Sequence, residues 1–212
     1  MPSVARFRPV LEKKDAENLI IDDIGKTRIM NDFADGGESL GLQNTCMIEF
    51  PDSDDHESEQ RYLHFIVHYR PKDGLYRGAE ILFDFDFLHT DFPYTPPNVK
   101  CLTECIWHPN IARNGSVCHS ILHRTGEPCW RPDYTLSFIV AVLATMFDVH
   151  ETYGQHSDSF NTLSPLNQDA AAQYNSNFDE YKRRVRSCVE ESQRLARARP
   201  IKPESIADDY KK

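Results

Sequence analysis

Four short apolar runs follow one another between residues 45 and 102, and they limit what this chain can fold into more than any other feature. The runs are TCMIEF (45–50), RYLHFIVHY (61–69), EILFDFDF (80–87) and NVKCL (98–102). In the third run aromatic and aliphatic residues alternate with mainly acidic ones, which predicts a half-buried antiparallel strand. The first connection, PDSDDHESEQ, is interpreted as a solvated acidic loop. Short polar connections favour pairing of consecutive strands as a four-stranded antiparallel meander.

Helical patterns flank the predicted sheet. Residues 15–34 carry apolar positions at helical spacing and predict an amphipathic helix, weakened at Gly25. Thr135 is the expected N-cap of an apolar helix over 136–147 that should lie across the sheet as core. Residues 165–195 predict one or two further helices, with an apolar stripe that is interpreted as core packing: Phe178, Tyr181, Val185, Cys188 and Val189.

The fold class is therefore predicted to be α+β, with a long connection in its centre. The order is an N-terminal helix, the four-stranded meander, an irregular stretch, the buried crossing helix and C-terminal helices. DFPYTPP places three prolines in six residues, and residues 104–134 show no regular pattern. An irregular stretch of that length inside a compact domain usually carries function.

Composition and charge exclude several classes of protein. The 212 residues, 40% of them hydrophobic, suit one soluble domain with extensions. A net charge of −9 argues against nucleic acid as the main partner. No apolar run is long enough for a membrane span or a secretory signal, so we expect a cytoplasmic or nuclear protein whose six cysteines are reduced thiols.

The cysteines and histidines of the central stretch allow a zinc site and a Cys–His nucleophile as alternatives. The zinc hypothesis is disfavoured because no C-x2-C knuckle occurs. A Cys–His pair needs a histidine beside Cys118 in space, which sequence alone does not show. The candidate metal ligands are Cys101, Cys105, His108, Cys118, His119, His123 and Cys129.

The central stretch carries a group of motifs in a fixed order. HPN is followed by seven residues and Cys118, with Trp130 and Pro132 downstream. Around them stand YRGAEILFDFDF, DFPYTPPNVKC, HPNIARNGSVCHSIL, WRPDYTL and PLNQDAA. Together these motifs resemble the active-site signature of ubiquitin-conjugating enzymes. The resemblance covers residues 28–190. It implies a catalytic domain at 15–198 of the fold named after these enzymes, a flexible extension at 1–14 and a polar tail at 199–212.

The resemblance also implies roles for the matched residues. Cys118 corresponds to the cysteine that carries the modifier as a thioester, and Asn110 to the asparagine that stabilises the oxyanion or braces the loop. His108 and Pro109 are expected to hold the active-site turn. A surface for the activating enzyme and for ligases is expected at Phe92, Tyr94, Pro97, Trp130 and Pro132.

The chain departs from the family pattern beside the active site. His119 follows the cysteine where Leu is usual, and about four extra residues precede Trp130. Ser164 stands at the substrate gateway where many members carry an acidic residue. A serine cannot act as a base at neutral pH, so an acidic group of the segment 148–161 is the candidate substitute: Asp148, Glu151 or Asp158.

Within the family, the similarity is greatest to the branch that charges the ubiquitin-like modifier of cullins. The expected partners are that modifier, its activating enzyme, a RING-type ligase and cullins, with no nucleic acid and no membrane. No cofactor or metal is expected, because the upstream activating enzyme uses the ATP. A divergent ubiquitin-conjugating enzyme, a non-catalytic binding module of the same fold and a zinc-binding interaction domain are the alternatives.

Overall fold

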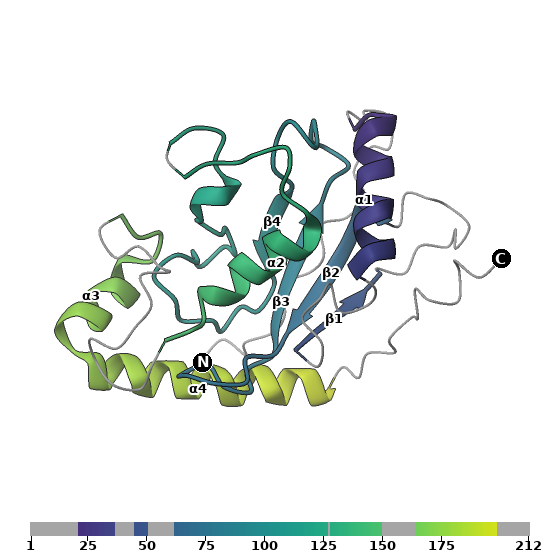
Figure 1. Ribbon diagram of the computed structural model, residues 1–212. Coiled ribbons are helices and arrows are strands. Elements are labelled where there is room, and N and C mark those ends of the chain that lie inside the picture. Colours follow the sequence, from purple (N-terminus) through teal and green to yellow (C-terminus); the bar gives the residue numbers. More distant parts are fainter. Residues whose placement is uncertain (1–20, 37–44, 51–61, 127, 150–163, 199–212) are drawn as a thin grey trace.

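The computed structural model describes residues 21–36, 45–50, 62–126, 128–149 and 164–198 (Figure 1). The predicted extension 1–14, the tail 199–212, the acidic loop and most of the segment 148–161 lie outside these ranges. The elements are α1 (Asp23–Gly36), β1 (Cys46–Glu49), β2 (His64–Tyr69), β3 (Ile81–Asp86), β4 (Asn98–Cys101), the 3-10 turn η4 (Ser120–Leu122), α2 (Leu136–Thr145), α3 (Gln168–Ser176) and α4 (Phe178–Ala198). This order confirms the predicted α+β fold. None of the helices in these ranges has an apolar stretch long enough to cross a membrane.

The four strands form one sheet in the order β1-β2-β3-β4, and every neighbouring pair is antiparallel. The meander is therefore confirmed, with strands one to three residues shorter than the apolar runs that predicted them. The central pairing places Phe65 opposite Phe85 and Val67 opposite Phe83. These residues share one face, and their side chains form the floor of the core.

The prediction that β3 is half-buried was wrong, because both of its faces are buried. Glu80, Asp84 and Asp86 are at most 7% exposed. Strand β2 supplies partners for Asp84 and Glu80, and the Leu88 amide just after β3 donates to Asp86. His64 Nε2 lies 2.8 Å from Asp84 Oδ1, and His68 contacts Glu80. The acidic alternation marked a paired polar layer, since a buried carboxylate needs partners as much as an exposed one needs water.

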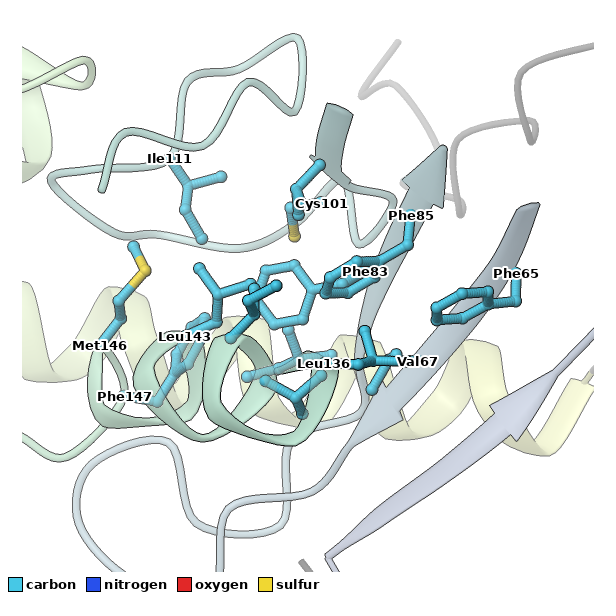
Figure 2. Close-up of a cluster of buried hydrophobic side chains, with 14 of the residues drawn as sticks. Phe65, Val67, Phe83, Phe85, Cys101, Ile111, Leu136, Leu143, Met146 and Phe147 are labelled. Carbon is cyan, nitrogen blue, oxygen red and sulfur yellow. The ribbon is translucent and has the colours of Figure 1, made fainter. Parts of the chain in front are cut away.

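The helix α2 lies across the aromatic face of the sheet (Figures 1 and 2). Its inward face, Leu136, Ile139, Val140 and Leu143, is at most 3% exposed. Thr135 is the N-cap, as predicted, and its hydroxyl accepts a hydrogen bond from the Phe138 amide. Figure 2 shows Leu136 and Leu143 facing Val67, Phe83 and Phe85, with Ile111 of the central stretch closing the other side. Through Ile111, the same core supports the stretch that carries the candidate site.

The N-terminal helix begins later than the sequence predicted. Ile21 and Asp22 are not helical, and the Asp22 carboxylate accepts a hydrogen bond from the Gly25 amide, which caps the helix at that point. Ile24, counted in the predicted apolar face, is 60% exposed. Residues 15–20 lie outside the described residues.

The C-terminal region forms two helices separated at Asn177. The Asn177 side chain accepts from the Glu180 amide and so starts α4. The predicted stripe on α4 packs against the core as expected, with Tyr181 and Val185 fully buried. In Figure 1, α4 runs along one end of the molecule, below α2 and the sheet.

Gly25 is required for close packing and does not merely weaken α1. A Cβ atom at this position would lie 2.3 Å from the carbonyl oxygen of Phe92 and 2.8 Å from the Ile21 side chain. The helix therefore touches the backbone of the segment before β4. This contact ties α1 to the predicted partner surface.

We predict that Gly25→Ala destabilises the protein, although alanine is the better helix former. The helix gains up to about 1 kcal/mol in propensity, whereas forcing apart two packed backbones costs typically about 1–3 kcal/mol. The exposed Thr27→Ala, two residues along the same helix, should change stability by less than about 0.5 kcal/mol. Urea unfolding measures both, and a Gly25→Ala variant at least as stable as the wild type would contradict the close packing.

Candidate active site

The seven residues between Asn110 and Cys118 fold back as a short hairpin. Ile111 pairs with Val117 in an antiparallel bridge, and the Cys118 amide donates to the Asn110 carbonyl at 2.9 Å. At the tip the Ser116 amide donates to the Asn114 side chain, and Gly115 adopts φ +88°, which favours glycine. The sequence spacing therefore sets a register in which Cys118 lies directly opposite Asn110.

The hairpin is fastened to the edge of the sheet. Lys100 of β4 forms a bridge with Ser116, and the Cys101 amide donates to the Gly115 carbonyl at 2.8 Å. The predicted long loop is thus partly regular, because it forms an isolated bridge with β4 and then the turn η4. The site rests on the rigid sheet rather than on an isolated loop.

His108 joins this hairpin to the end of α2. Its Nδ1 accepts from the Asn110 amide at 3.0 Å, and its Nε2 donates to the Met146 carbonyl at 2.9 Å. These partners fix a neutral imidazole protonated on Nε2, since an amide only donates and a carbonyl only accepts. The side chain is fully buried, and burial lowers its pKa to about 4. At neutral pH the imidazole of His108 is therefore uncharged, and both of its nitrogens are engaged in hydrogen bonds.

Helix α4 braces the residue before His108. The Tyr76 hydroxyl donates to the Trp107 carbonyl at 2.6 Å and lies 2.7 Å from the Tyr181 hydroxyl. The guanidinium of Arg184 lies 4.6 Å from the centre of the Trp107 ring, a cation–π contact. Burial raises the pKa of both tyrosines, so this pair stays neutral.

Helix α3 contacts the turn through Asn167, a residue that the sequence analysis did not single out. The Asn167 amide donates to the Pro109 carbonyl at 2.9 Å, while its side chain caps α3 by accepting from the Ala170 amide. Asn167 is 6% exposed. The motif PLN was part of the family resemblance, and an asparagine before a helical run was the signal that would have found it.

Of Ser164 and its three possible acidic substitutes, the structure describes Ser164 and Asp148. Ser164 is exposed three residues before Asn167, so the hydrogen bond of Asn167 to Pro109 places this segment beside the active-site turn. Asp148 is exposed just after α2. Glu151 and Asp158 lie outside the described residues.

Cys118 shares its partial exposure with Cys46 and Cys188, but burial raises the pKa of its thiol less than theirs. All six cysteines are free. Burial raises the pKa of the Cys46 and Cys188 thiols to about 12, so they stay protonated. Cys118 is only partly buried, which raises its pKa to a lesser extent. His123 Nε2 lies 3.7 Å from its sulfur, so a histidine does stand beside this thiol.

The predicted partner residues divide into an exposed and a buried group. Tyr94 is 55% exposed and Pro132 is exposed, whereas Phe92, Pro97 and Trp130 are buried. The Trp130 indole donates to the Pro93 carbonyl at 2.8 Å and packs on Phe92. The buried residues therefore position the two loops, and the exposed ones are available for contact.

Helix α1 adjoins the same loops. The Arg28 guanidinium donates to the Asp133 carbonyl at 3.0 Å, and the Asp32 carboxylate accepts from the Leu136 amide at 2.7 Å. Two further apolar side chains are exposed on the adjoining helices, Ile24 at 60% and Phe138 at 41%. In the described part of the chain, no three side chains of the His, Cys, Asp and Glu types are arranged to hold a metal ion.

The hairpin thus places a partly exposed thiol opposite an asparagine, on a four-stranded meander crossed by one buried helix. The family profile described as "Ubiquitin-conjugating enzyme" matches residues 28–189, about three quarters of the chain. The chain belongs to the ubiquitin-conjugating enzyme family.

Similar proteins within this family divide between two modifiers. The NEDD8-conjugating enzyme UBC12 of Yarrowia lipolytica is 34% identical over 147 residues, 69% of this chain and 70% of that protein. The NEDD8-conjugating enzyme UBE2F of Danio rerio is 33% identical over 150 residues, 70% of this chain and 72% of that protein. A probable ubiquitin-conjugating enzyme E2 7 of Caenorhabditis elegans is 36% identical over 133 residues, 58% of this chain and 73% of that protein.

We predict that His108 makes the stability of this conjugating enzyme depend on pH. Because its folded pKa of about 4 lies below the value near 6.5 of an unfolded histidine, its contribution is present above about pH 6.5 and is lost as the pH falls toward 4. That difference corresponds to roughly 3 kcal/mol. His108→Gln should lose about 2 kcal/mol at pH 7.5 and show a smaller further loss on acidification.

His68 is the matched control, because its pKa shifts the other way. Burial opposes its protonation, but hydrogen bonds and charges from Glu49 and Glu80 outweigh burial and raise the pKa. Its contribution is therefore largest below about pH 6.5 and is lost as the pH rises through the folded pKa. Denaturant unfolding between pH 4 and 8 compares His108→Gln with His68→Gln, and equal pH slopes would rule out the assigned states.

Proposed function

We propose that this enzyme accepts a ubiquitin-like modifier as a thioester on Cys118 and transfers it to a substrate lysine. The observation that carries the proposal is the hydrogen bond from the Cys118 amide to the Asn110 carbonyl, which fixes an accessible thiol on a braced hairpin. Exchange between two thioesters is nearly balanced in free energy. The enzyme therefore needs mainly to position its thiol and to stabilise the oxyanion.

Asn110 is the candidate for oxyanion stabilisation. Its backbone is bonded on both sides, to His108 through the amide and to Cys118 through the carbonyl. Asn110 is 2% exposed, so its side-chain amide group is enclosed and has little freedom to reorient. A donor that is already oriented stabilises developing charge without reorganisation, which is the main source of catalysis in such sites.

We propose NEDD8 as the modifier and cullins as substrates, with a RING-type ligase as partner. The support is that two relatives covering about 70% of this chain are named NEDD8-conjugating enzymes. Ubiquitin is the second candidate, because the relative from Caenorhabditis elegans is named a probable ubiquitin-conjugating enzyme at 36% identity over a shorter stretch.

Choice of modifier is expected to lie in docking to the activating enzyme. The exposed apolar side chains Ile24, Tyr94 and Phe138 lie on elements joined by the contacts of Gly25, Trp130 and Arg28. Exposed aromatic and aliphatic groups on a rigid support are typical of protein contacts. The enzyme receives only what its activating enzyme delivers, so this surface selects the modifier.

We predict that Cys118 alone carries the adduct. Cys118→Ala should abolish a reductant-sensitive band in charging reactions, whereas Cys118→Lys should give a band that survives reductant, since an amide replaces the thioester. Cys129→Ala, in the same loop, should charge normally. An adduct retained in Cys118→Ala would place the thioester on another cysteine.

For Asn110, we predict that removal of the amide separates the two half-reactions. Asn110→Ala should charge almost normally and discharge to lysine roughly 10²-fold more slowly, as when one oxyanion donor is removed. Asn114→Ala, at the tip of the same hairpin, should affect neither rate strongly. Parallel loss of charging rate and melting temperature in Asn110→Ala would assign the side chain a bracing role only.

The modifier is tested by direct competition. The enzyme is mixed with ATP and either the NEDD8-activating enzyme with NEDD8 or the ubiquitin-activating enzyme with ubiquitin, and thioester formation is followed without reductant. Faster charging with NEDD8 supports the proposal. Equal or faster charging with ubiquitin would overturn the choice of modifier, and no charging of folded protein by either system would favour a binding module.

A further inference from the structure

The imidazole of His123 returns to Cys118 because a single turn of 3-10 helix separates them. The turn η4 spans Ser120–Leu122, with His119 as its N-cap and His123 as its C-cap. A 3-10 turn has three residues per turn, so the chain reverses over this short distance. The result is a separation of 3.7 Å between His123 Nε2 and Cys118 Sγ, within reach of a weak hydrogen bond to sulfur.

The backbone of His123 is fixed on both sides, although its ring is exposed. Its amide donates to the Ser120 carbonyl at 3.0 Å, and its carbonyl accepts from the Trp130 amide at 2.8 Å. Trp130 is buried and anchored to the Pro93 carbonyl. The position of the imidazole beside the thiol is therefore a consequence of the packed loop.

The neighbouring His119 uses its ring to cap η4 rather than to contact Cys118. Its Nδ1 accepts from the Ile121 amide at 3.3 Å and so caps η4. Burial, followed by the proximity of His123, lowers its pKa, which keeps it neutral. In the described part of the chain, His123 is the residue whose ring nitrogen points to the Cys118 sulfur.

Cys118 has a use for such a group. Partial burial raises the pKa of its thiol, so the resting side chain is protonated and is a weak nucleophile. Histidine is the side chain best suited to exchange a proton near neutral pH. Sγ and Nε2 lie 3.7 Å apart. Catalytic hydrogen bonds are often this long in the free enzyme and shorten when the substrate binds, which permits proton transfer.

We propose that His123 is a catalytic residue that takes the proton of Cys118 during charging and returns a proton to Cys118 during transfer. This inference rests on the proposed function, since it assigns the proton steps of the same thioester cycle. The role is assigned to His123 because its ring is exposed and lies beside the Cys118 sulfur. His108 is excluded, because both of its nitrogens are engaged by backbone groups.

The proton balance closes in both half-reactions. In charging, Cys118 Sγ forms a bond to the modifier's carbonyl carbon, its proton passes to His123 Nε2, and the bond to the activating enzyme's sulfur breaks. That sulfur leaves as a thiolate and takes up the proton from the imidazolium. Before transfer, His123 takes up a proton from water. In transfer, the lysine nitrogen bonds to the carbonyl carbon, the bond from that carbon to Cys118 Sγ breaks, Sγ takes the proton from His123, and the nitrogen releases its own proton to water.

His123→Gln tests the proposal, because glutamine can accept a hydrogen bond but does not hold a proton. We expect single-turnover charging at pH 7 to slow by about 10²-fold, at the low end for loss of a general base because thiols need less help than hydroxyls. At about pH 9.5 hydroxide forms the thiolate directly, and the deficit should shrink to about threefold. His119→Asn keeps a capping oxygen at η4 and should stay within about twofold of the wild type at every pH.

The outcomes separate this inference from the proposed function. A deficit in His123→Gln that is constant from pH 6.5 to 9.5, or that accompanies a lower melting temperature, would reveal a structural role and overturn the proposal. Should the wild type not charge at all, alkylation by iodoacetamide still tests the pair, with the Cys118 peptide quantified by mass spectrometry. Slower alkylation of His123→Gln below pH 8 but not near pH 9.5 supports proton exchange, and identical profiles would refute it.

Discussion

The buried imidazole of His108 is the contact on which the active-site geometry depends. It joins the carbonyl of Met146 at the end of α2 to the amide of Asn110 at the base of the hairpin. The hairpin in turn sets Cys118 opposite Asn110. A buried hydrogen bond contributes about 1 kcal/mol net, but leaving either backbone group unpaired costs about 1–3 kcal/mol. A side chain that cannot bond both groups is therefore expected to destabilise the turn.

The rest of the molecule supports this turn from several directions. Trp107 is held by Tyr76 and Arg184, and Pro109 is held by Asn167. These contacts come from the start of α3, from α4 and from the loop before β3. They hold the backbone of the turn in place while the Cys118 thiol stays partly exposed. The docking surface follows the same plan, with buried residues such as Trp130 supporting exposed ones such as Tyr94.

The sequence predicted the sheet, the crossing helix and the position of the reactive cysteine, for identifiable reasons. Alternation and short connections determine a meander, and a continuous apolar run after Thr135 determines a core helix. The state of the acidic face of β3 was not predictable, because its pairing with His64 and His68 depends on strand register. The start of α1 was missed because Asp22, a capping residue, interrupts an apolar pattern that continues before it.

The site itself shows the same division. The HPN turn and Cys118 were found by motif, and their spacing has a physical cause in the hairpin register. The proximity of His123 to Cys118 was not predictable, since it needs one 3-10 turn and an anchor at Trp130.

The measurement that tests the account most directly is nitrogen NMR of the histidine rings. It should show His108 neutral, protonated on Nε2 and unchanged from pH 8 to about 5, because its pKa is about 4. A ring that titrates near pH 6.5, or one protonated on Nδ1, would contradict the hydrogen bonds that hold the turn.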